Sequence, residues 1–200
     1  MSADPMTEPE LPRKAPIELL TDLEKAAGFP IRPEYVEGMV VIPPPADDNH
    51  NETIQEILFQ FRQAGVRLAG TGNGYATELS GADLLALVIP DFYVRRRRPC
   101  DLDEAFRRAH QGWYPIKMIS LAGEITSTNH ETDTGPKYRS YAEAGVDVYV
   151  VVHRLERKVY VFSDPVPGER RYDTVTETSL GQKVRLPAPY PVLDTSICLG

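Results

Sequence analysis

Residues 117–153 have the sequence KMISLAGEITSTNHETDTGPKYRSYAEAGVDVYVVVH. Lys117 to Ile125 has the length and apolar content of a buried strand, and Asp133 to Ala144 has the pattern of a helix that Gly145 ends. Val146 to His153 is so rich in valine that we expect a central strand. Two strands joined by a crossover helix are typical of an α/β or α+β domain with a mixed sheet.

The flanking sequence predicts further strands and helices around this unit. A short amphipathic helix is expected over Ala15 to Ala27, and Glu34 to Ile42 predicts a strand, or two strands about a tight turn at Gly38. The other expected elements are a helix from about His50 to Ala64, extended segments at 66–79 and 84–95, a short helix at 102–110, a hairpin ending in 158–162, and short strands at 170–177 and 183–186. Gly70-Thr71-Gly72-Asn73-Gly74 predicts a hairpin turn or bulge, since it lacks a phosphate-loop pattern.

Composition limits the classes of protein that this chain could represent. Its 200 residues fit one domain, which we place at residues 16–200 after a flexible tail at residues 1–15. No apolar run is long enough to span a bilayer, and two cysteines at no metal or redox spacing suit a reducing cytoplasm. The net charge of −7 argues against a general nucleic-acid coat protein, but a nuclease needs only local basic groups.

Asp91 and Glu124 are the residues that point most directly to chemistry. They fall on separate predicted strands, and neighbouring strands lie roughly 5 Å apart, so the two carboxylates could share one ion. Mg²⁺ prefers such hard oxygen ligands, and the backbone carbonyl of Ile125 would add another. Lys137, on the helix after Glu124, could stabilise an attacking hydroxide. This composition predicts a magnesium-dependent phosphodiesterase site, although Thr126 stands where such a site usually carries lysine.

Several segments resemble one family in the same order along the chain. They are Glu34-Tyr35-Val36-Glu37-Gly38, Pro44-Pro45 with His50, Pro90-Asp91-Phe92-Tyr93-Val94, Gly123-Glu124-Ile125-Thr126-Ser127, and Asp133 to Lys137 with Tyr141, Gly145 and Tyr149 to Val152. Over residues 30 to 195 the chain resembles the Uma-type putative restriction endonucleases of the PD-(D/E)XK nuclease superfamily. It departs from their pattern in the small and polar residues of Ile119 to Gly123, in Val150 and His153, and in a basic insert at 95–110.

The resemblance implies more than the residues do alone. It implies a restriction-endonuclease-like fold, in which a central mixed sheet is flanked by helices and carries additional β hairpins. It implies a DNA endonuclease that uses Mg²⁺ or Mn²⁺ and works as a homodimer, with Glu34 as an early acidic residue of the site. In this branch the lysine lies on the following helix, which makes Lys137 the replacement for the missing lysine at Thr126.

Each of these residues also has a purely structural interpretation. Asp91 could be a strand-end residue, Glu34 an exposed strand residue, and Lys137 a solvated helix residue, while Glu124 could form a buried salt bridge. Glu37 is expected to be an exposed turn residue. Arg95-Arg96-Arg97-Arg98 could contact phosphates, form a solvated loop, or offset local acids such as Asp103. The alternative function is therefore a catalytically inactive nuclease-fold domain that acts as an interaction or nucleic-acid-binding module.

Overall fold

A computed structural model describes residues 14–78, 84–126 and 130–199 of the chain. The tail expected at residues 1–15 lies almost wholly outside the described residues. Ser127 and the whole connection between the segments expected at 66–79 and 84–95 lie outside them as well. Within the described part, no helix is both long enough and apolar enough to cross a membrane.

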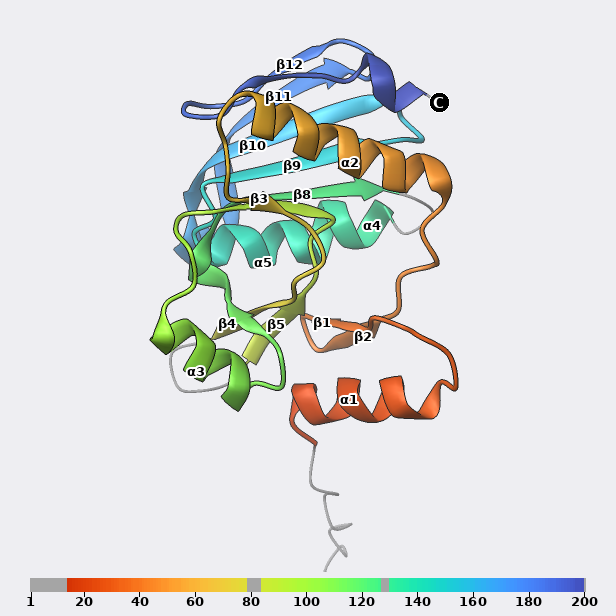
Figure 1. Cartoon of the computed structure of the whole chain (residues 1–200), viewed down its shortest axis with the longest axis vertical. Coiled ribbons are helices and arrows are strands. Elements are labelled where there is room, and N and C mark those ends of the chain that lie inside the picture. Colours follow the sequence, from red (N-terminus) through yellow and green to blue (C-terminus); the bar gives the residue numbers. More distant parts are fainter. Residues whose placement is uncertain (1–13, 79–83, 127–129, 200) are drawn as a thin grey trace, which may run out of the picture.

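Two sheets form the body of the molecule (Figure 1). The larger one has the strand order β11-β10-β9-β8-β6-β3, with β3 at Ala69–Gly70, β6 at Phe92–Arg95, β8 at Ile119–Thr126, β9 at Val148–His153, β10 at Lys158–Val166 and β11 at Arg171–Ser179. The smaller one has the order β2-β1-β5-β4-β7, with β1 at Glu34–Val36, β2 at Met39–Val41, β4 at Tyr75–Glu78, β5 at Leu84–Val88 and β7 at Tyr114–Pro115. A separate pair joins β12 at Lys183–Arg185 to β13 at Val192–Asp194.

The larger sheet is mixed, as the sequence predicts. β8 and β9 are parallel, with Glu124 opposite Val151, whereas the other neighbours in this sheet are antiparallel. Every residue of both strands is buried, because helices cover both faces of the sheet. The valines of β9 therefore mark a central strand, and this prediction is confirmed.

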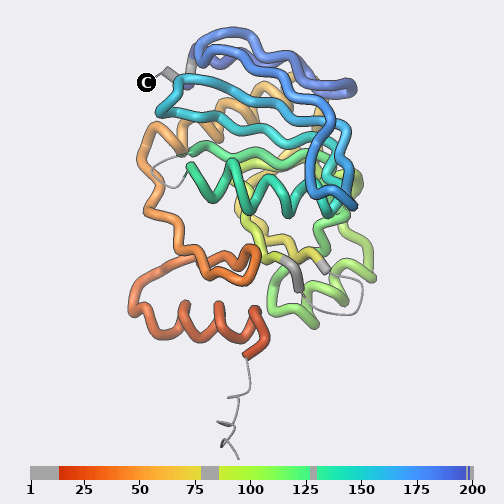
Figure 2. Tube along the Cα trace, turned by 180° about the vertical axis from the view of Figure 1, so that it is seen from behind, coloured from red at the N-terminus to blue at the C-terminus, as the bar shows by residue number. Residues whose placement is uncertain are grey.

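Alternate residues of β9 pack against different helices, which lie on opposite faces of the sheet (Figures 1 and 2). α2 (Asp48–Gln63) packs Ile57 and Phe61 with Val150 in one cluster. α5 (Tyr138–Glu143) packs Tyr141 with Tyr149 in the other. Among the described residues, the other helices are α1 at Pro16–Ala26, which packs on the smaller sheet, α3 at Asp101–Ala109 and α4 at His130–Thr132. Short helical turns lie at 116–118, 133–137, 167–169 and 196–199.

The predicted crossover helix is interrupted by a π-helical turn. The helix begins earlier than expected, with α4 at His130–Thr132, and continues through a π turn at Asp133–Lys137 into α5. Pro136 lies inside the π turn and has no N–H to donate, so a regular α-helical bond is impossible at this point. Gly145, at a φ of 68°, follows the end of the helix as predicted.

The extended segments expected at 66–79 and 84–95 are each divided between the two sheets. β3 and β6 belong to the larger sheet, whereas β4 and β5 belong to the smaller one. The prediction of a hairpin turn at Gly70–Gly74 is therefore wrong, because β3 pairs with β6 and β4 pairs with β5. A Cβ atom on Gly74 would lie 2.5 Å from the ring of Trp113, so this glycine serves a close packing contact.

Candidate active site

A cavity of about 850 Å³ opens between the start of α2, the end of β8, the helix at 130–137 and the segments on either side of the β1–β2 hairpin. All the residues that the sequence proposes for the site line it, namely Glu34, Asp91, Glu124, Ile125 and Lys137. Asp133 and His50 line it as well. The structure thus brings together side chains from five segments that are far apart in the sequence.

Lys137 lies at the centre of a cluster of carboxylates. Its Nζ is 2.8 Å from Glu34 Oε2, 3.2 Å from Glu124 Oε1 and 3.6 Å from Asp133 Oδ1. The side chain is only 5% exposed, so the interpretation of Lys137 as a solvated helix residue is wrong. Burial alone would lower the pKa of Lys137, but the negative charges of Glu124 and the other carboxylates outweigh it and hold this pKa well above its usual value.

Glu124 is held in a buried environment by two neighbours. The hydroxyl of Tyr141 donates a 2.8 Å hydrogen bond to Oε1, the same oxygen that faces Lys137. Burial raises the pKa of Glu124 well above its usual value, Lys137 opposes this rise, and the charges of nearby carboxylates add to it. Glu34 is also fully buried, and its Oε1 accepts a 2.5 Å hydrogen bond from the backbone N–H of Ile89.

Asp91 lies at the wall of the cavity and pairs with a histidine. Its Oδ2 accepts a 2.7 Å hydrogen bond from the N–H of Ile125 and lies 3.0 Å from His50 Nε2. The bond to Asp91 raises the pKa of His50 against the opposing effect of burial. His50 is in place because Asp47 caps α2 by accepting a 2.7 Å hydrogen bond from the His50 N–H.

The charges of the cluster leave an excess of negative groups. The carboxylates of Glu34, Asp91, Glu124 and Asp133 face one ammonium and the imidazole of His50. The pKa of Asp133 is raised to about 6, chiefly because the carboxyl is buried; Lys137 opposes this rise, and the charges of Asp91 and Glu34 add to it. A buried excess of hard oxygen donors fits a divalent cation in both charge and chemistry. In the present arrangement, however, no three His, Cys, Asp or Glu side chains among the described residues are grouped so that they could hold a metal ion.

The comparisons place the chain in a family. The Uma2 family, described as putative restriction endonucleases, matches residues 18–197. The chain belongs to the Uma2 family. A crystal structure of a putative nuclease belonging to DUF820 from Anabaena variabilis ATCC 29413 is similar, with a TM-score of 0.58 and 15% identity over 88% of this chain and 96% of that one. At this identity the similarity shows the fold alone, which is restriction-endonuclease-like. Comparison with curated proteins finds no match.

A second ion cluster ties the hairpin that carries Glu34 to the helix that carries Lys137. Glu37, in the β1–β2 turn, accepts hydrogen bonds of 2.7 and 2.6 Å from Nε and Nη2 of Arg139, and one of 2.5 Å from Nη2 of Arg170. These contacts hold the pKa of Glu37 below its usual value, and the bond to Arg139 contributes most. The expectation of an exposed turn residue is wrong, since the Glu37 side chain is only 19% exposed.

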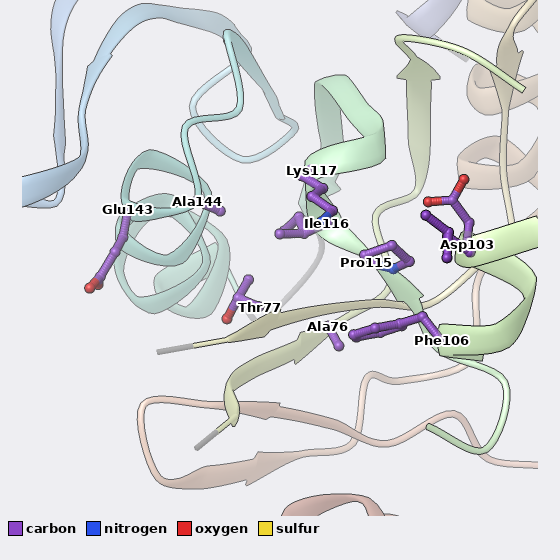
Figure 3. A pocket seen from close by; sticks show the side chains of 10 residues that line it. Ala76, Thr77, Asp103, Phe106, Pro115, Ile116, Lys117, Glu143 and Ala144 are labelled. Carbon is purple, nitrogen blue, oxygen red and sulfur yellow. The ribbon is translucent and has the colours of Figure 1, made fainter. Parts of the chain in front are cut away.

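The arginines at 95–98 partly offset local acids, which was one of the alternatives for this run. Arg96 forms a bidentate pair with Asp147, and Arg97 pairs with Asp103, which is buried. Asp103 also lines a smaller cavity of about 340 Å³ between α3 and the end of α5, apart from the candidate site (Figure 3). Arg96 and Arg97 therefore form ion pairs within this Uma2 protein.

Four residues near the site were not assigned to it from the sequence, and the first, His50, was expected only at the start of a helix. Asp133 stands four residues before Lys137, a helical spacing that places the two side chains on one face, and this spacing is a usable signal. Tyr141 stands four residues after Lys137 and could have been found in the same way. Arg154 lines the cavity from just beyond β9, and only the three-dimensional structure places it there.

Proposed function

We propose that this protein is a metal-dependent endonuclease that hydrolyses phosphodiester bonds in DNA. Membership of a family of putative restriction endonucleases supports a nuclease. The observation that carries the proposal is the position of Lys137, which is buried between Glu34 and Glu124 in a cavity that also contains Asp91. Perturbed, buried charges gathered in a cavity are characteristic of functional sites.

The residues take the following roles in this proposal. Asp91, Glu124, the carbonyl of Ile125 and Glu34 would hold Mg²⁺ or Mn²⁺, which would neutralise charge on the phosphate and activate a water molecule. Lys137 orients the nucleophilic water and offsets negative charge as it develops on the phosphate oxygens. Tyr141 fixes the Glu124 carboxylate through its hydroxyl, and the Ile125 N–H does the same for Asp91.

Cleavage of plasmid DNA, offered both as the supercoiled duplex and as heat-denatured single strands, with Mg²⁺, Mn²⁺ or EDTA tests this function. Glu124→Gln removes the charge but keeps the volume, and Glu177→Gln, on the exposed side of β11, is the matched control. We expect metal-dependent cleavage by the wild type and by Glu177→Gln, and loss of cleavage by Glu124→Gln. Equal cleavage by all three proteins would assign the activity to a contaminant.

One observation favours the alternative of an inactive interaction module. The ammonium of Lys137 already occupies the space between two of the proposed ligands, as it would in a purely structural ion pair. The two functions differ in whether Mg²⁺ or Mn²⁺ binds. A melting temperature that neither ion changes, together with no cleavage of DNA, would establish the inactive module.

Two further expectations belong to the same proposal. Restriction-endonuclease-like enzymes often pair so that each subunit cuts one strand, and we propose a homodimer on this basis, which light scattering coupled to gel filtration can test. We also propose a cytoplasmic location, which is consistent with the free thiols of Cys100 and Cys198.

A further inference from the structure

One wall of the candidate site is apolar and stiff. It is built by two connections that run on the same side of the molecule, one from α1 to β1 and one from β2 to α2 (Figure 1). The first contributes Phe29, Pro30 and Ile31, and the second contributes Ile42 and Pro43 to Pro45. Both line the same cavity as Glu124 and Lys137.

This apolar wall is exposed although its residues are hydrophobic. The Phe29 side chain is 67% exposed and that of Ile42 is 50% exposed, and the three prolines that follow Ile42 are exposed as well. Contiguous exposed apolar surface beside a site indicates a ligand-binding face. Because proline fixes its own φ angle, this surface is formed in advance, and a ligand that packs on it loses little free energy to the ordering of the protein.

The charges around the cavity do not suit the backbone of a DNA duplex. Its basic lining residues are Arg32, His50, Lys137 and Arg154. Lys137 is already surrounded by carboxylates, His50 pairs with Asp91, and Arg154 pairs with Asp47 at 2.9 Å. The acidic lining residues are Glu34, Asp47, Asp91, Glu124 and Asp133, and the whole chain has a net charge of −7. Duplex binding depends mainly on neutralising the phosphates of the backbone. The bases of a duplex are stacked on one another, so their faces cannot pack on an aromatic side chain unless a base leaves the stack. A single strand offers base faces, which stack on aromatic residues whatever their sequence.

We propose that the site takes a single-stranded segment of DNA, with an unpaired base packed on Phe29 and the proline wall. Two arginines contact the flanking phosphates and direct the strand towards the carboxylates. Arg32 now donates a 2.6 Å hydrogen bond to the carbonyl of Gly72, and Arg154 exchanges its pair with Asp47 for a phosphate. This inference rests on the proposed nuclease function and adds the form of the substrate. It distinguishes an enzyme that cuts single strands, flaps or frayed ends from one that cuts intact duplex.

Fluorescence anisotropy with a short labelled oligothymidylate and the matching duplex, in EDTA, tests the binding. Phe29→Ala is compared with Phe59→Ala, because Phe59 is an exposed phenylalanine on α2 that does not line the cavity. Stacking on an aromatic side chain predicts that Phe29→Ala weakens single-strand binding at least about five-fold, while Phe59→Ala leaves it unchanged. Two phosphate contacts predict a slope of about −1.4 for the logarithm of affinity against the logarithm of salt concentration.

Three results would overturn this inference. They are tighter binding of the duplex than of the single strand, equal effects of the two phenylalanine substitutions, and loss of self-association in Phe29→Ala, which would make the wall a contact between two copies of the chain. Cleavage assays separate the two proposals. Metal-dependent cutting of duplex but not of single strands would keep the nuclease and refute its substrate. Single-strand binding through Phe29 without any cutting would keep the binding site and refute the nuclease.

Discussion

Replacing Lys137 by methionine removes the one ammonium at the centre of the carboxylate cluster while keeping an unbranched side chain. Lys137 is 5% exposed and lies within 3.6 Å of three carboxylates, those of Glu34, Glu124 and Asp133. Removing one partner of a buried ion pair typically costs about 3–5 kcal/mol, because the other charge stays buried without compensation. We expect a free-energy loss of this size for Lys137→Met near neutral pH.

Lys158→Met is the matched control. Lys158 Nζ lies 2.8 Å from Glu177 Oε1, the same distance that separates Lys137 from Glu34, but these side chains are 39% and 51% exposed. Surface pairs of this kind contribute little to stability, because water screens the two charges. The difference between the two variants in lost free energy of unfolding therefore measures the effect of burial on ion pairs of equal length.

The loss for Lys137→Met should depend on pH with a definite sign. The pKa values of Glu124 and Asp133 are raised in the folded protein, so stability falls as the pH rises through these values and both groups must ionise while buried. Without Lys137 the folded-state pKa values rise further. The destabilisation should therefore be smaller near pH 4, where the raised pKa values keep these carboxyls largely protonated in the folded protein, and largest near pH 8.

Urea unfolding in EDTA at several pH values between about pH 4 and pH 8 measures this effect, supported by thermal melts. A loss of about 3–5 kcal/mol corresponds to a fall in melting temperature of roughly 6–20 °C for a domain of this size. If Lys137→Met were as stable as Lys158→Met near pH 8, or equally destabilised at every pH, the charge analysis of the cluster would be refuted.

Three further predictions follow from individual contacts. In the absence of metal, wild-type stability should fall as the pH rises from about 4 to above about 6, because the pKa of Asp133 is raised to about 6. Mg²⁺ should restore more stability above this pH range than below it, and thermal melts measure both effects. Glu37→Gln should lower kcat for DNA cleavage about 10- to 100-fold with little change in KM, and should also lower the melting temperature, because Glu37 holds the hairpin of Glu34 against the helix. An unchanged kcat would contradict this role. Gly123→Ala should lower the free energy of unfolding in urea by about 1–3 kcal/mol, because the new Cβ would overlap the ring of Phe92. Gly168→Ala, the control, has open space around it and should stay within about 0.5 kcal/mol of wild type. Equal stabilities of the two variants would refute the packing argument.

The elements that the sequence predicts correctly are those whose signals are local. The valine run of β9 and the end of the crossover helix at Gly145 each depend on neighbouring residues alone. The same holds for α2, which begins at Asp48 because the preceding Asp47 caps it. Each of these signals reports burial or hydrogen bonding within one element, which composition and spacing capture directly.

The errors concern contacts between residues that are distant in the sequence. Gly70 and Gly74 have the composition of a turn, yet they pass the chain from one sheet to the other beneath Tyr93 and Trp113. Glu37 looks like a turn residue, because its arginine partners come from much later segments. Strand pairing and ion pairing of this kind leave no local pattern, so a single sequence cannot reveal them.

The small residues before Glu124 show how a departure from the family pattern can serve the site. Gly123 lacks a side chain where the ring of Phe92, the residue after Asp91, crosses β8. This close approach pairs Phe92 with Gly123 across β6 and β8 and allows the N–H of Ile125 to reach the Asp91 carboxylate at 2.7 Å. Gly123 therefore leaves room for the Phe92 ring in the core and helps to position Asp91.

Thr126, which stands where such sites usually carry lysine, has a similar structural explanation. Thr126 is fully buried, and its Oγ1 accepts a hydrogen bond of 3.3 Å from the N–H of Arg154 and lies 3.5 Å from the carbonyl of Val152. Thr126 thus joins β8 to the end of β9, and the ammonium comes instead from Lys137 in the π turn. Because Glu34, Glu124 and Lys137 lie on three different elements, their cluster exists only when the hairpin, the sheet and the helix are docked together. The stability of this docking and the charge balance of the site are therefore coupled. A substitution that weakens the docking should also change the ionisation of the cluster, and a substitution in the cluster should also change the stability of the docking.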